Sequence, residues 1–151
     1  MVGEGYDDEA HVRRCFELAR TAAQRGDDPF GSVLVADDEV VATASNRVHT
    51  DEDLRGHPEL DLAFRAAREY DPESRRELVL YTSTEPCPMC AGGLAIAGLG
   101  RVVYSVSSEA LRELTGGAPS VRAATILGDR TEVVGPVLPE AGLAVHEAFG
   151  W

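Results

Sequence analysis

The sequence has 151 residues, with 26 aspartates and glutamates against 14 basic residues that are all arginine, and its formal net charge is −12. This length suits one domain over residues 1–151 with a real core, and the acidic charge disfavours nucleic acid as a partner. An acidic, lysine-free composition also suggests a salt-adapted (halophilic) proteome, with compositional drift as the alternative.

Neither a signal peptide nor a membrane span is expected. The first ten residues are acidic and lack an apolar run, and the longest apolar stretch, 91–100, is about half of what a span requires. Three cysteines form no disulfide framework. Cys15 falls in an amphipathic helical pattern and is expected in the core. A reducing cytoplasm is therefore the predicted location.

The first half of the chain predicts two helices around a hairpin. Val12, Phe16 and Ala19 recur at helical spacing, and Gly26 and the residues after it end that helix. His11 is expected on the helix surface. The predicted elements are a helix over 7–25, strands over 31–35 and 40–45, a polar loop over 46–54 and a helix over 58–70.

The second half alternates strands with helices. This rhythm implies right-handed crossovers and a partly parallel sheet flanked by helices. The predicted elements are a strand over 78–82, a small-residue helix over 88–99, a strand over 102–106, a helix over 108–114, a strand over 131–137 and a final helix from Pro139 toward Phe149.

Two short motifs carry the chemistry. His57 and Glu59 flank a proline, and thirty residues on Cys87 and Cys90 form a Cys-x-x-Cys pair. Two thiolates and an imidazole make a three-ligand metal site with an open position, and the carboxylate adds an acid/base group. Each motif has a proline that suits the first helical position. Two helix N-termini are therefore expected to converge there, and their partial positive charge favours thiolate.

These motifs, H-x-E followed by P-C-x-x-C, resemble the signature of the zinc-dependent cytidine/deoxycytidylate deaminase superfamily. Residues 29–35, Asn46 and residues 101–104 resemble its guanine deaminase, cytosine deaminase and tRNA adenosine deaminase branch. The resemblance covers residues 29–105. It implies an α/β fold, a three-layer α/β/α sandwich with a central mixed sheet of about five strands. The sequence departs from the family at Pro58, usually alanine, and at Asp61, where an uncharged residue is expected.

The resemblance also implies a set of functional residues. One zinc ion per chain would be held by His57, Cys87 and Cys90, with a water or hydroxide as the fourth ligand. Glu59, which must not bind the metal, would accept a proton from that water and later protonate the departing amine.

Three further residues are candidates for substrate binding. Asn46 matches an asparagine that binds the substrate's ring edge in this branch; its alternative role is that of a turn residue. Phe30 could form a wall for a flat base or be plain core. Trp151 could stack on a base as part of a C-terminal lid, as in guanine deaminases, or dock the last helix.

The leading function is hydrolytic deamination of a free nucleobase or nucleoside, with guanine slightly favoured over cytosine, cytidine and adenosine. A tRNA adenosine deaminase remains an alternative. So do a structural zinc module and a Cys-x-x-Cys redox protein, although the latter has no use for His57 and Glu59. Family members commonly dimerise, so a homodimer is expected.

Overall fold

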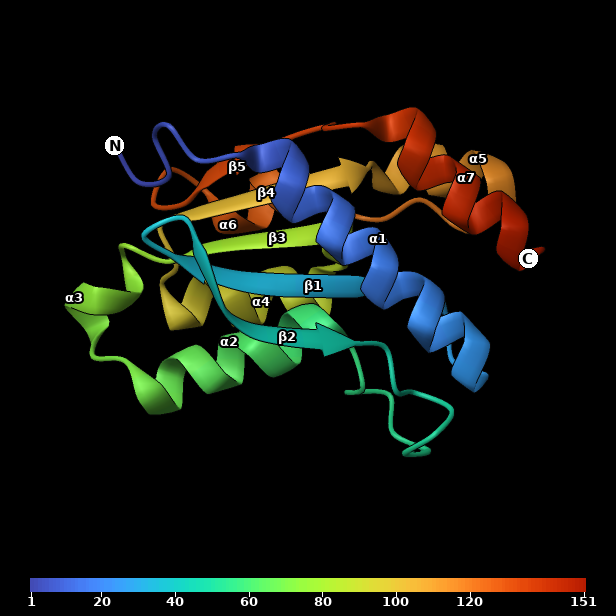
Figure 1. The fold of residues 1–151 in the computed structure, drawn as a ribbon, viewed down its shortest axis with the longest axis horizontal. Coiled ribbons are helices and arrows are strands. Elements are labelled where there is room, and N and C mark those ends of the chain that lie inside the picture. Colours follow the sequence, from blue (N-terminus) through green and yellow to red (C-terminus); the bar gives the residue numbers. More distant parts are fainter.

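The structure, a computed structural model, describes residues 1–151 and is built on one five-stranded mixed sheet (Figure 1). Its strands are β1 (Gly31–Ala36), β2 (Glu39–Ser45), β3 (Val79–Thr84), β4 (Arg101–Val106) and β5 (Glu132–Val134). Their order across the sheet is β2-β1-β3-β4-β5. β1 pairs antiparallel with β2 and β3, whereas β3, β4 and β5 run parallel. The predicted hairpin and the partly parallel sheet are both confirmed.

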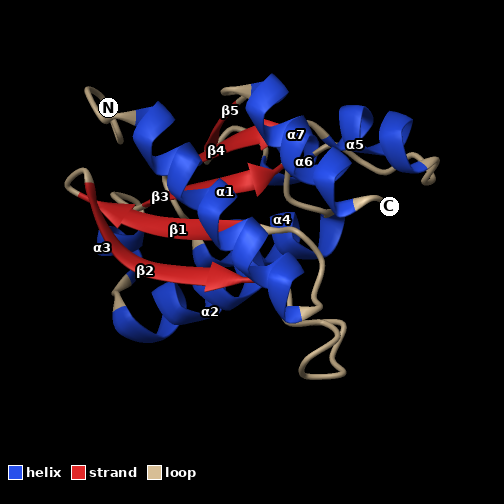
Figure 2. Ribbon diagram, turned by 45° about the vertical axis from the view of Figure 1, so that its right-hand side comes forward, coloured by secondary structure: helices blue, strands red, loops and turns tan.

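Helices cover both faces of this sheet. They are α1 (Asp8–Arg25), α2 (Pro58–Glu69), α3 (Pro72–Arg75), α4 (Pro88–Ala97), α5 (Ser108–Thr115), α6 (Ala123–Leu127) and α7 (Pro139–Phe149). α1 and α7 pack on one face, and α2, α4 and α6 pack on the other (Figures 1 and 2). The predicted three-layer α/β/α sandwich is confirmed. None of these helices combines the length and the apolar character that crossing a bilayer would need.

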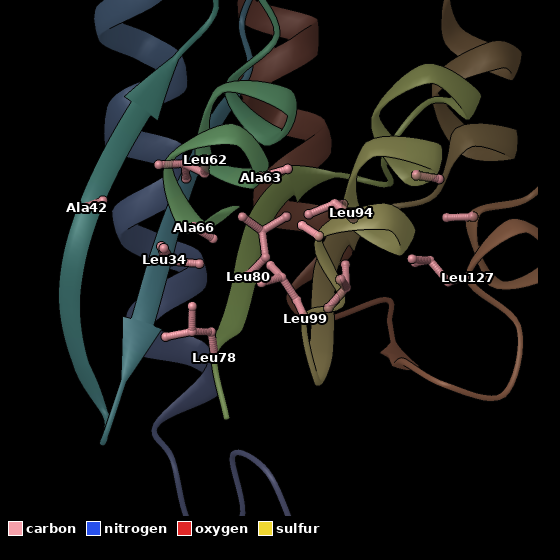
Figure 3. Close-up of a cluster of buried hydrophobic side chains, with 14 residues drawn as sticks. Leu34, Ala42, Leu62, Ala63, Ala66, Leu78, Leu80, Leu94, Leu99 and Leu127 are labelled. Carbon is pink, nitrogen blue, oxygen red and sulfur yellow. The ribbon is translucent and has the colours of Figure 1, made fainter. Parts of the chain in front are cut away.

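Two apolar cores, one on each side of the sheet, hold the layers together. Leu62 of α2 and Leu94 of α4 meet Leu80 of β3 in the larger core (Figure 3). Phe16 of α1 belongs to the other core, and Cys15 is fully buried beside it, as predicted. Each such buried side chain contributes on the order of 1.5–3 kcal/mol. The strands between these cores are apolar on both faces, as expected of a sheet covered twice.

The two helices that matter for the candidate site begin at the predicted prolines. Pro58 is the first residue of α2 after His57, and Pro88 is the first residue of α4 after Cys87. α4 also lies close to α2 at Gly93. A Cβ atom added there would stand only 2.6 Å from the Cδ1 atom of Leu60. The small residues predicted to permit this close approach do so at Gly93.

Some local predictions were wrong. His11 is buried rather than on the helix surface: its Nε2 lies 2.7 Å from Asp38 Oδ1, and its ring packs on Tyr81. α3 and α6 were not foreseen. The last strand is shorter than predicted, since Pro136, which has no N–H to donate, follows soon after it. Asp61 is exposed, so the charge at that position disturbs no packing.

Candidate active site

His57, Cys87 and Cys90 lie together where α2 and α4 begin. The Nδ1 atom of His57 is 3.6 Å from the sulfur of Cys87 and 3.4 Å from that of Cys90, and the three ligand atoms lie within 4.8 Å of one another. Zn–S and Zn–N bonds in a tetrahedral site imply N···S separations of about 3.5 Å. The donor set and its spacing therefore fit a zinc ion.

The two sulfurs differ in charge. The neighbouring Cys90 thiol and His57 imidazole lower the pKa of Cys87 to about 4, so Cys87 is a thiolate at neutral pH. The neighbouring Cys87, together with burial, raises the pKa of Cys90. Metal ions displace protons from such ligands. A bound cation would thus displace the thiol proton of Cys90.

Glu59 stands in the first turn of α2, beside this cluster but not in it. Its side chain is buried, bonds to no other side chain and lines the same cavity as His57 and Cys87. Burial raises the pKa of Glu59 to about 7, and the Cys87 thiolate adds to the effect. A carboxyl group with a pKa near neutrality can both accept and donate a proton, which suits general acid–base catalysis.

Asn46 and Phe30 line the same cavity, which has a volume of about 220 Å³. Asn46 is buried, and its Oδ1 accepts a hydrogen bond of 3.1 Å from the backbone N–H of Val48. That bond leaves the side-chain NH₂ group available to a ligand. Phe30 lines the cavity as well, so it is not a core residue alone.

A buried carboxylate that the sequence reading missed holds one wall of this cavity. Glu85 accepts hydrogen bonds from the backbone N–H groups of Ser108 (3.1 Å) and Ala123 (2.9 Å) and from Nε of Arg122 (3.0 Å to each oxygen). Burial alone would raise the pKa of Glu85, but the guanidinium and the two amides hold it below its usual range. The start of α5 is thereby fixed next to the cysteine loop. A glutamate two residues before Cys87 was the signal available in the sequence.

Asp27 likewise fixes the loop that leads to His57 by accepting hydrogen bonds from its backbone. It is fully buried and accepts from the backbone N–H groups of His49 (3.0 Å) and Thr50 (2.8 Å), and it pairs with Arg25 at 2.7 Å. From the sequence, Asp27 was predicted only to be part of the segment that ends the first helix. Its position between a helix-ending glycine and a proline is the only hint that the sequence offers.

Trp151 lies beside the cavity without lining it. Its ring is 6.0 Å from that of Phe30, and its indole N–H donates to Nδ1 of His146 over 3.2 Å. Nε2 of the same histidine is 2.9 Å from Oγ1 of Thr84, which does line the cavity. Since Nδ1 accepts from Trp151, His146 carries its proton on Nε2. About half of the Trp151 side chain is exposed.

His146 gives the fold a pH dependence. Burial lowers the pKa of its imidazole from 6.5 to about 4. Between these values the unfolded chain binds the proton and the folded chain does not, so the free energy of unfolding falls as the pH drops from 6.5 toward 4. The full effect is at most about 3 kcal/mol. Urea unfolding at pH 7.5 and 5 should show a larger loss of stability for the wild type than for His146→Gln. Equal losses in the two proteins would refute this account.

Solved structures of other proteins share the fold. Guanine deaminase from Nitrosomonas europaea superposes with a TM-score of 0.79 at 22% identity, over 95% of this chain and 85% of that one. Guanine deaminase from Bacillus subtilis superposes with a TM-score of 0.63 at 26% identity, over 93% of this chain and 92% of that one. The fold is therefore that of the cytidine deaminase-like enzymes.

Sequence relatives agree with this. A probable cytosine deaminase of Schizosaccharomyces pombe is 34% identical over 94% of this chain and 91% of its own length. A guanine deaminase of Bacillus subtilis is 34% identical over 64% of this chain and 63% of its own length. Residues 6–132 match the family model of the MafB19-like deaminases. The chain therefore belongs to the MafB19-like deaminase family, within the generally zinc-dependent enzymes that the two motifs resemble.

Proposed function

We propose that this protein is a zinc-dependent hydrolase that removes the amino group of a free nucleobase or nucleoside as ammonia. Guanine is slightly favoured over cytosine, cytidine and adenosine. One observation carries the proposal: a His/Cys/Cys ligand set, a buried carboxyl group with a raised pKa and a free amide group meet at a single cavity. Hydrolytic deamination requires all three features. Metal binding alone requires only the His/Cys/Cys ligand set.

His57, Cys87 and Cys90 would hold one zinc ion per chain. When bound in such a site, zinc lowers the pKa of a coordinated water toward neutrality and so makes it a nucleophile at physiological pH. The three protein ligands leave the fourth position to that water. His57 and Cys87 line the cavity, so an ion that they held would border the space available to a substrate.

Glu59 would move the protons. Its carboxylate would accept a first proton from the water and deliver it to a ring nitrogen. It would then accept the second proton, from the hydroxyl group newly bonded to the ring carbon, and deliver it to the departing amine, which leaves as ammonia as the carbonyl group forms. Because it lies among buried groups with no side-chain partner, it is free to serve both steps. Proton transfer by a group positioned in this way contributes about 10²–10⁴-fold to the rate.

Asn46 and Phe30 would hold the ring. The NH₂ group of Asn46 can donate to an acceptor on the ring edge, and Phe30 offers an aromatic face to a flat base. Trp151 packs next to Phe30, which supports the interpretation of the C-terminus as a lid over a base. This aromatic pair is the reason to put guanine first. Cytosine is the second candidate, because the probable cytosine deaminase aligns with nearly the whole chain.

The alternative functions fit less well. A structural zinc module would need a fourth protein ligand, and the cluster has three. A redox pair would have no use for His57 and Glu59 at the same point. Some relatives are tRNA-specific adenosine deaminases, among them one from Bacillus subtilis at 31% identity over 64% of this chain. The net charge of −12 disfavours an RNA substrate.

We further propose that residues 1–151 form one deaminase domain, that the protein is located in the cytoplasm and that it forms a homodimer. The dimer is supported by apolar side chains exposed on the outer layer, namely Ile96 (89% exposed) and Met89 on α4 and Phe64 on α2. Burying such side chains against a second copy of the chain is favourable. Sedimentation velocity should give twice the mass of the 16.2 kDa chain, and a monomer at micromolar concentration would refute the dimer.

Ammonia release from guanine, cytosine, adenine and their nucleosides, at low and at molar salt, tests the proposed function. Zinc is quantified on the same sample. We expect release from at least one of these compounds with about one zinc ion per chain. Stoichiometric zinc with no release from any of them would overturn the proposed substrate class. A protein without zinc that forms a Cys87–Cys90 disulfide would support the redox alternative.

A further inference from the structure

One face of α5 forms a wall of the cavity. Ser108, Leu111, Arg112 and Thr115 all line it, and they follow the spacing i, i+3, i+4, i+7 that places residues on one helix face. The segment after α5 adds Gly117, Ala118 and Ser120 to the same wall. This wall therefore decides which part of a substrate can be recognised away from the metal ligands.

Arg112 is the cation on this wall, and its guanidinium has no acceptor in the protein. Among the half-buried arginines, the other four each bond to a carboxylate or to a backbone carbonyl: Arg65, Arg75, Arg76 and Arg101. The Arg112 guanidinium makes no hydrogen bond and no ion pair, even though Glu109 lies three residues away on the same helix. Glu109 contacts Arg122 instead. Unsatisfied donors beside a cavity favour a ligand that brings acceptors.

The position of Arg112 along α5 determines which edge of a bound substrate must carry the hydrogen-bond acceptors for its guanidinium. Ser108, at the start of the helix, donates its backbone N–H to Glu85, two residues before the ligand Cys87. Arg112 is four residues further, which is about 6 Å along the helix axis. A flat bicyclic base with its reacting amine at the ligand cluster could therefore present its opposite edge to Arg112.

We propose that Arg112 is the residue that selects guanine, by donating two parallel hydrogen bonds to O6 and N7 of the base. This inference rests on the proposed function and names the substrate within it. Guanine carries its amine on C2, and N7 and O6 lie on the far side of the bicycle. A guanidinium matches that pair of acceptors bidentately, as arginine does when it reads guanine in nucleic acids.

The same geometry disfavours the other bases. Cytosine has no imidazole ring and so no N7. Adenine presents an N–H donor next to N7, which opposes a guanidinium, and its amine sits on that same edge. A pair of acceptors at this distance from the reacting carbon is therefore a feature of guanine that neither cytosine nor adenine shares.

The test compares guanine with 7-deazaguanine, in which a C–H group replaces N7, for the wild type and for Arg112→Gln. Arg130→Gln is the matched control, because Arg130 is also without a side-chain partner but is exposed and outside the cavity. We expect wild-type kcat/KM to be about tenfold or more higher for guanine than for 7-deazaguanine. Arg112→Gln should bring the two values together, and Arg130→Gln should keep the wild-type ratio.

Binding gives a second readout that does not depend on turnover. In a Glu59→Gln background, the Kd for guanine should rise about tenfold or more when Arg112→Gln is added. The Kd for 7-deazaguanine should rise by a smaller factor, because that base keeps only O6 as an acceptor for Arg112. An unchanged ratio in Arg112→Gln, or ammonia release from cytosine but not from guanine, would overturn the role of Arg112 and leave the deaminase proposal standing. A zinc-loaded protein that deaminates none of these compounds would overturn the proposed function itself.

Discussion

Glu59→Gln should keep its zinc and lose turnover. Glutamine has nearly the same shape as glutamate but cannot accept and return a proton near neutral pH, so we expect kcat to fall by at least about 10²-fold. Because Glu59 is not one of the three clustered metal ligands, metal content should stay at the wild-type level. Ammonia release and zinc quantified on the same preparation measure both effects.

A matched control is available on the same helix. Glu69, at the exposed end of α2, pairs only with Arg65 at 3.5 Å. Glu69→Gln removes a carboxylate from α2 without touching the cavity, so its turnover should equal that of the wild type. Turnover in Glu59→Gln comparable with the control would contradict the assignment of the proton transfers to Glu59.

Replacing either cysteine of the cluster should remove the metal. Cys87→Ala or Cys90→Ala leaves two of the three protein ligands, and the loss of zinc affinity should exceed the 10–100-fold that follows from disturbing outer-shell partners of a metal site. Zinc binding is also coupled to folding, so the thermal midpoint should fall. Metal analysis after dialysis and thermal unfolding with and without added zinc are the measurements.

Cys15→Ala is a control that distinguishes the loss of zinc from a general loss of stability. Cys15 is fully buried in the core between α1 and the sheet and does not belong to the cluster of metal-ligating groups. Its replacement should lower the free energy of unfolding by about 1 kcal/mol through a small cavity and leave zinc stoichiometric. Full zinc occupancy in Cys87→Ala or in Cys90→Ala would show that the ion, if present, is held elsewhere.

Local sequence rules predicted most of the elements. Asp7 caps α1 by accepting a hydrogen bond from the backbone N–H of Ala10, and Gly26 ends that helix in the left-handed conformation. Pro58 and Pro88 open α2 and α4 where they were predicted to. Each of these signals acts through bonds between residues a few positions apart, which is why one sequence suffices to read them.

α6 shows where such rules fail. Its first N–H group, on Ala123, is satisfied by the carboxylate of Glu85, thirty-eight residues earlier, and not by a neighbouring cap. His11 fails for the same reason, since its partner Asp38 comes from the turn between β1 and β2. No local pattern announces a hydrogen bond that forms only after distant segments have packed.

The sequence by itself determined the chemistry of the candidate site. Residue types and spacing within two short motifs predicted the ligand set of His57, Cys87 and Cys90 and set Glu59 apart, because the geometry within each motif is that of a single helix turn. The contact between the two motifs, which are thirty residues apart, is a tertiary one. The tertiary structure alone decided what surrounds them. Glu85 and Asp27 fix the cavity walls through long-range bonds, and the packing of α5 brings Arg112 to the cavity without an acceptor. Under the proposed function, recognition of the substrate depends on these distant contacts, and a linear pattern does not encode the distance between segments that meet only in the fold.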